Sequence, residues 1–174
     1  MLHLFHPAFL HFTVAFLVAG GGLEAWGLLA DREGPRRLGS TLLLIGLVSL
    51  VPTIATGYLA ANTLSSLEDG GLLLGSHERN GWILLGLLIG SQFWKGWFRG
   101  KLPARHRPFY SAVLIAAVLL TIYGAWLGGR MVYIEGYGVA GTPVQSAPSF
   151  GSRDRLKSVP ATRAGRLRKI ALNA

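Results

Sequence analysis

The chain of 174 residues contains no cysteine. This absence excludes disulfides, thiolate zinc sites, cysteine-bound iron–sulfur clusters and covalently attached c-type haem within the chain. Charged residues are also scarce at 14%, whereas hydrophobic residues make up 51% and the mean hydropathy is +0.42. A soluble domain normally carries about 25% charged residues. The composition therefore predicts an integral membrane protein.

Several sequence signatures are absent as well. There is no phosphate-binding glycine loop, no nucleophile elbow and no zinc-protease helix motif. We therefore expect an electron-transfer or accessory subunit rather than a stand-alone enzyme. The first residues also lack the Lys and Arg of a signal peptide. The first apolar stretch is accordingly predicted to be a retained membrane span.

Four stretches of the sequence are apolar enough to cross a bilayer as helices, which takes roughly 20 residues. They cover residues 8–30, 38–61, 81–97 and 108–127. The third is the shortest, and we expect Lys95 near its end to extend toward the membrane surface. The polar segment between the second and third stretches is predicted to be a loop outside the bilayer. The predicted fold is an all-α integral membrane bundle of four transmembrane helices.

The bundle is predicted to cover residues 1–140, and residues 141–174 to form a basic, poorly structured extension. Seven of the 17 Lys and Arg residues fall between Arg153 and Ala174. Basic segments beside a membrane usually bind anionic lipid or acidic partners. We expect anionic lipid at this tail and at the basic loop of residues 99–107, and we expect no nucleic-acid binding.

The basic residues also predict an orientation in the membrane. The first loop holds three Lys or Arg residues and the third holds five, whereas the second holds Arg79 alone. Short loops rich in positive charge stay in the cytoplasm. Both termini are therefore predicted on the periplasmic side of a bacterial inner (cytoplasmic) membrane. The basic tail is the feature that argues for the opposite orientation.

The histidines are clustered along the chain. His3, His6 and His11 lie at the start of the first span, His77 lies before the third, and His106 lies in the basic loop. With this topology, the first four share one membrane face. His6 and His11 point about 140° apart on a helix, so one of them faces the bundle centre more easily than the other. We predict His11 as the inward ligand because it lies deeper in the apolar segment.

A bis-imidazole site for a b-type haem is the leading hypothesis for these histidines. His11 and His77 are the predicted metal ligands, and His6, Arg79 and Arg130 complete the predicted cofactor-binding set. The two arginines are expected to pair with the haem propionates.

The predicted walls of the haem site are aromatic side chains of three helices, Tyr58, Trp82 and Tyr123. Two alternatives to the haem hypothesis stay open at this point. The histidines can serve as hydrogen-bonding groups at the membrane interface, or they can join Glu78 in a non-haem metal site or a proton relay.

Glu24 is an acidic residue deep within an apolar stretch. An ionisable group in a membrane is costly and is a functional candidate by default. One interpretation is a carboxylate that is hydrogen-bonded inside the bundle or reaches Arg36 or Arg37. The other is proton transfer or transport through Glu24.

Several motifs resemble a bacterial membrane family known as domain-of-unknown-function family 2231. The most specific are the opening His-Pro-x-x-x-His-Phe at residues 6–12 and the Gly-Gly-x-x-Val-Tyr at residues 128–133. The similarity covers about residues 3 to 140 and leaves out the tail after Tyr137. It places the family's histidines on His6, His11 and His77, and Arg130 at a position where a less charged residue is expected.

The resemblance implies a four-helix membrane protein associated with redox modules of the Rieske or cytochrome c type. The predicted function is a redox subunit that holds haem b near the periplasmic face and passes electrons between quinol and a cytochrome c or Rieske-type partner. The alternative is a cofactor-free anchoring or assembly subunit that joins other subunits of a membrane complex.

Overall fold

The computed structural model describes residues 5–64, 71–134 and 136. They form four long helices: α1 (His6–Leu29), α2 (Glu33–Leu64), α3 (Gly71–Trp97) and α4 (Arg107–Tyr133), with a short 3-10 helix, η2 (Ala104–His106), before α4. Proline lies in the first turn of both α1 and α4, where its missing N–H costs no helical hydrogen bond. The described part of the chain contains no strand. The prediction of a four-helix, all-α bundle is confirmed, whereas residues 141–174 lie outside the described residues.

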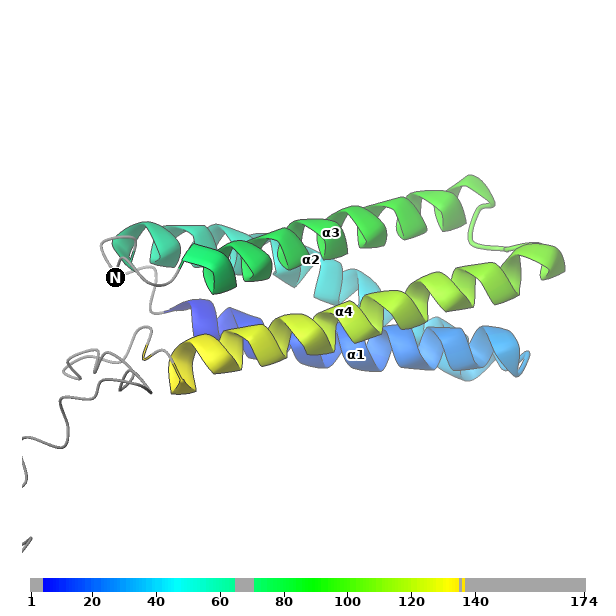
Figure 1. Ribbon diagram of the computed structural model, residues 1–174. Helices are drawn as coiled ribbons and strands as arrows, with labels where there is room; N and C mark the ends of the chain where they lie inside the picture. Colours follow the sequence, from blue (N-terminus) through cyan, green and yellow to red (C-terminus); the bar gives the residue numbers. More distant parts are fainter. Residues whose placement is uncertain (1–4, 65–70, 135, 137–174) are drawn as a thin grey trace, which may run out of the picture. The chain divides into compact units, whose positions relative to one another are not determined.

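The four helices are arranged so that successive helices are antiparallel neighbours (Figure 1). α1 packs against α2 and α4, and α3 packs against α4 and, more sparsely, against α2. Within the described ranges, α1 and α3 share no direct backbone contact, so they occupy opposite corners of the bundle. These two helices run in the same direction (Figure 1). Side chains of α1 and α3 can therefore meet only across the bundle centre.

Three of the helices are long and apolar enough to cross a membrane. They are His6–Leu29, Glu33–Asn62 within α2, and Ala104–Tyr133, which joins η2 to α4. α3 is less clearly apolar, because its early turns carry His77, Glu78, Arg79 and Asn80.

The polar segment between the second and third apolar stretches is mostly helical, so the prediction of a loop over residues 62–80 was wrong. α2 continues to Leu64 and α3 already begins at Gly71. Residues 72–79 contain several good helix formers, Leu, Glu and Arg among them, and a helix can continue beyond its apolar portion. Residues 65–70 lie outside the described residues. His77 therefore belongs to the second turn of α3.

Glycines allow α1 and α2 to approach each other closely. A Cβ added to Gly20 would lie 2.5 Å from the backbone nitrogen of Leu43, and one added to Gly39 would lie 2.8 Å from the Cα of Glu24. Such distances are too short for any real side chain, so only glycine fits at these positions. Small residues that bring backbones together are typical of helix interfaces in membranes.

Leucines fill the middle of the bundle. Leu17, Leu43, Leu88 and Leu114 each expose 2% or less of their surface. Buried polar side chains lie toward the ends, including Thr13, Thr53 and Asn80 on one side and Glu24, Ser91 and Ser111 on the other. The interior therefore consists of two polar clusters with an apolar layer between them, which we call the leucine layer.

Candidate functional site

The first polar cluster contains His6, in the first turn of α1. Its Nδ1 lies 2.9 Å from the backbone oxygen of Thr53 and 3.3 Å from Oγ1 of Thr56, both on α2. Because a carbonyl only accepts hydrogen bonds, the short contact to Thr53 places the ring proton on Nδ1. Nε2 of His6 then keeps a free lone pair. A histidine held through Nδ1 by a backbone carbonyl is the usual arrangement of a metal-binding imidazole.

His77 precedes the apolar portion of α3. It lies at the same end of the bundle as His6, on the helix at the opposite corner. Burial lowers the pKa of His77, and the nearby imidazole of His6 lowers it further, whereas a hydrogen bond to the backbone of Gly124 acts in the opposite direction. The ring is therefore kept neutral, the form that binds metals. Its Nδ1 is buried and has no hydrogen-bond partner among the residues described. The chain thus brings the imidazoles of His6 and His77 within electrostatic reach of each other at one end of the bundle.

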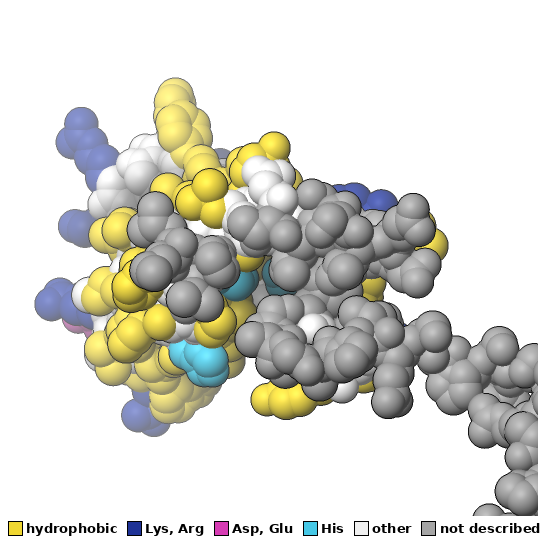
Figure 2. Space-filling view, turned by 90° about the vertical axis from the view of Figure 1, so that its left-hand side faces the viewer, with side chains coloured by type: hydrophobic (Ala, Val, Ile, Leu, Met, Phe, Trp, Pro, Cys, Tyr) yellow, Lys and Arg dark blue, Asp and Glu magenta, His cyan; other side chains and the backbone are white. Residues whose placement is uncertain are grey.

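Glycines of α2 and α4 make room for these imidazoles. A Cβ on Gly57 would lie 2.9 Å from Cε1 of His6, and a Cβ on Gly128 would lie 3.5 Å from Cε1 of His77. Gly124 provides the same clearance for Asn80, whose side-chain amide donates to the backbone oxygen of Leu120 over 3.1 Å. Viewed from this end, histidine side chains are visible both on the outer surface and deeper between the helices (Figure 2).

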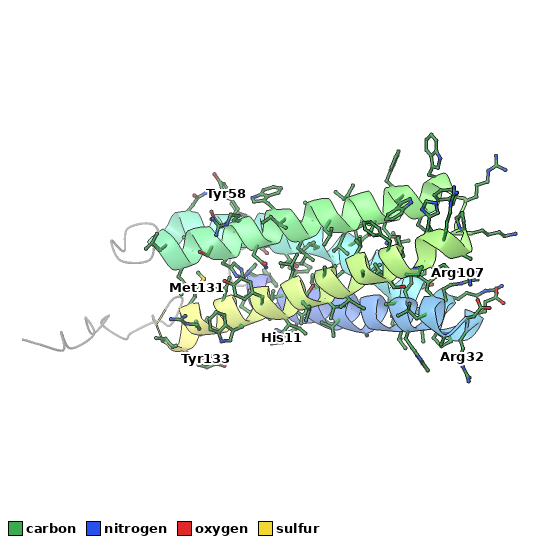
Figure 3. All side chains as sticks on the ribbon, turned by 45° about the vertical axis from the view of Figure 1, so that its right-hand side comes forward. His11, Arg32, Tyr58, Arg107, Met131 and Tyr133 are labelled. Carbon is green, nitrogen blue, oxygen red and sulfur yellow. The ribbon has the colours of Figure 1, made fainter. Side chains whose placement is uncertain are left out.

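His11, predicted as the inward ligand, is instead on the exposed side of α1 (Figure 3). Its Nδ1 lies 2.5 Å from the backbone oxygen of Pro7, on its own helix. The buried side of α1 includes Thr13, Leu17 and Glu24, and His6 lies on that side whereas His11 does not. The predicted convergence of His11 with His77 is therefore replaced by that of His6 with His77.

The other predicted cofactor contacts are not gathered around this pair. Arg79 is exposed, and the guanidinium of Arg130 lies 5.0 Å from the centre of the Trp126 ring, on its own helix. The aromatic side chains predicted to wall a macrocycle, Tyr58, Trp82 and Tyr123, are 61%, 60% and 47% exposed. These aromatic rings face outward from the bundle.

The second polar cluster was only partly predicted from the sequence. Lys95 Nζ lies 2.5 Å from Oε1 of Glu24 and also donates to Oγ of Ser40. The Glu24 side chain is 1% exposed and that of Lys95 is 15% exposed. Lys95 thus turns inward, contrary to the expectation that it extends to the surface. Glu24 is hydrogen-bonded within the bundle. This agrees with the interpretation of Glu24 as a hydrogen-bonded carboxylate.

Regular spacing connects the two clusters. His6 and Glu24 on α1 are 18 positions apart, as are His77 and Lys95 on α3. Eighteen residues complete five helical turns, so each helix presents both of its groups on one side, about 27 Å apart along the axis. α1 and α3 run in the same direction at opposite corners of the bundle. His6 therefore lies at the same end as His77, and Glu24 lies at the same end as Lys95. This repeated spacing is the sequence signal that would have predicted the partner of Glu24.

A scan of protein-family models matches residues 2–141 to a family described as predicted membrane protein (DUF2231). The chain belongs to this family. The match confirms the resemblance carried by the His-Pro-x-x-x-His-Phe and Gly-Gly-x-x-Val-Tyr motifs. No significant match was found among curated proteins or among solved structures.

Membership of the DUF2231 family agrees with the apolar helices of the bundle. The described residues contain no group of three or more His, Asp or Glu side chains placed to bind a metal ion.

Proposed function

We propose that this DUF2231 protein is a membrane redox subunit that holds a b-type haem between His6 and His77. The observation that carries the proposal is the approach of two imidazoles from diagonal helices, one oriented by the Thr53 carbonyl and the other with a buried Nδ1 that has no partner among the described residues. His6 and His77 would hold the iron of such a haem, which would take two protein ligands. A closed site for a bare metal ion would need more protein ligands than the pair provides.

The residues around the pair have positioning roles in this proposal. The Thr53 carbonyl fixes the orientation of His6, and Gly57 and Gly128 leave the space that the two rings occupy. A bound haem supplies a one-electron couple, which suits transfer between quinol and a cytochrome c or Rieske-type partner. The apolar outer surface of the bundle suits contact with lipid and with other membrane subunits.

The haem hypothesis predicts a Soret band in the chain purified from haem-sufficient cells. His6→Ala and His77→Ala should each abolish the band, because each removes one of the two imidazoles that would hold the haem. His11→Ala is the matched control and should retain it, since this ring lies on the outer side of α1. A well-folded but colourless wild-type preparation would reject the haem and favour the anchoring or assembly role.

We also propose that α3 crosses the membrane together with the other three helices and that the histidine cluster faces the periplasm. The support is the charge distribution, because the first and third connections lie at the same end of the bundle and carry most of its basic residues (Figure 1). Figure 3 shows Arg32 and Arg107 at this end, with Tyr58, Met131 and Tyr133 toward the other.

The natural absence of cysteine gives this topology a direct test. Single cysteines can be introduced at Leu72 and Tyr133, which are 92% and 90% exposed, and at the exposed Lys101. In intact cells with a permeabilised outer membrane, an impermeant maleimide should label the first two positions. It should label position 101 only after the inner membrane is broken. Labelling of positions 72 and 101 from the same side would exclude a crossing by α3.

A further inference from the structure

All four helices contribute to the buried cluster around Glu24. Glu24 comes from α1, Ser40 from α2, Lys95 from α3 and Tyr110 from α4. Tyr110 is fully buried and lies within electrostatic reach of Glu24. Such convergence of polar groups inside an otherwise apolar bundle points to a site and not to simple packing.

The hydrogen bonding of this cluster is incomplete. Oε2 of Glu24 is buried and has no hydrogen-bond partner among the described residues. The ammonium of Lys95 thus satisfies only one of the two carboxylate oxygens. An unpaired carboxylate oxygen is costly to bury, whereas a proton bound to it removes the charge and turns an acceptor into a donor.

Lys95 lies at the edge of the cluster. It belongs to the last turn of α3, its side chain is more exposed than that of Glu24, and the basic loop follows directly. Its aliphatic stem is long enough to carry the ammonium toward lipid headgroups from such a position. Lys95 thus pairs with the buried carboxylate in the structure, and its stem is long enough for the ammonium to reach the membrane surface as well.

We propose that the ammonium of Lys95 and a proton compete for Glu24, so that this cluster is a buried proton-binding site near the basic end of the bundle. When Lys95 extends to the surface, Oε2 takes a proton from water and Glu24 becomes a neutral acid. When the proton returns to water, Lys95 pairs with the carboxylate again. The buried net charge is zero in both states, which avoids the large cost of burying a single charge.

Other ionisable groups face Glu24 from the neighbouring helices and stay in place in both states. Arg36 on α2 lies within electrostatic reach, and the phenol of Tyr110 faces Glu24 from α4. Neither the histidine pair nor a bound haem takes part, so this proposal stands or falls independently of the proposed redox function.

Infrared spectroscopy of the full chain in lipid nanodiscs tests the proton-binding site. On acidification from about pH 8 to about pH 4, the wild type should gain a carbonyl band of a protonated carboxylic acid. Glu24→Gln should lose this band. Glu33→Gln should retain it, because Glu33 is an exposed acid paired with Arg37 on the surface. Lys95→Met should show the band already at neutral pH, since no ammonium competes.

Lysine acetylation tests the movement of Lys95. At a single pH, labelling of Lys95 relative to the exposed Lys101 should be several-fold higher in Glu24→Gln than in the wild type. The proposal would be overturned by two results together. The labelling ratios would be equal in the two proteins, and the wild type would gain no Glu24 band down to about pH 4, as a permanent ion pair requires. The infrared titration of the wild type remains decisive even if a variant folds poorly.

Discussion

Lys95→Met is expected to destabilise the bundle by about 3–5 kcal/mol at neutral pH, because Glu24 loses its partner and can stay buried without charge only by binding a proton at a pH where a free carboxyl group is ionised. The loss should be measured at neutral pH as the change in the free energy of unfolding in mild detergent. It should shrink as the pH is lowered, since a protonated Glu24 needs no counter-charge. The same experiment on Lys95→Arg should show a smaller loss, because the positive charge is kept.

The double variant Glu24→Gln with Lys95→Met is the control for this prediction. Replacing both partners of a buried ion pair by neutral groups of similar size is often close to neutral for stability. The double variant should therefore recover most of the stability lost in Lys95→Met. A double variant as unstable as the single one would contradict the account, because the loss would then come from altered packing.

Gly39→Ala is expected to cost about 1–3 kcal/mol or more, because its Cβ would enter the backbone of α1. The added atom would lie 2.8 Å from both the Cα of Glu24 and the backbone oxygen of Gly20. Backbone atoms cannot rotate aside as a flexible side chain can. Thermal unfolding in detergent should show the loss, and the α1–α2 pair should separate enough to weaken the contact between Glu24 and Lys95.

Gly86→Ala is the matched control. Gly86 also lies within a helix, but a Cβ there meets no atom within 4 Å. Alanine favours a helix over glycine by about 0.5–1 kcal/mol, so this variant should be as stable as the wild type or slightly more stable. Equal losses for Gly39→Ala and Gly86→Ala would contradict close helix packing as the cause.

The number and order of the helices could be predicted from the sequence because uninterrupted apolar stretches of membrane length leave few alternatives. The side of each helix that faces the centre could not. A helix in lipid is apolar around its whole circumference, so hydrophobic periodicity carries little information. His11 was preferred over His6 because of its depth, whereas the structure places His6 on the buried side of α1.

The partner of Glu24 was missed for a different reason. A lysine near a helix end is equally compatible with extending to the membrane surface and with turning inward, and the sequence of α3 alone does not choose between them. The choice depends on a carboxylate 71 positions earlier in the chain. Within the sequence, only the equal spacing of His6 to Glu24 and of His77 to Lys95 connects the two helices.

The leucine layer between the two clusters gives the bundle an electrically insulating centre. The layer contains neither a histidine nor an acidic side chain. Its packed aliphatic side chains offer no hydrogen-bonding group to a chain of water molecules. Among the described residues, no fully buried ionisable side chain lies between the two clusters. Aliphatic packing in this way holds the two polar clusters apart inside one small bundle.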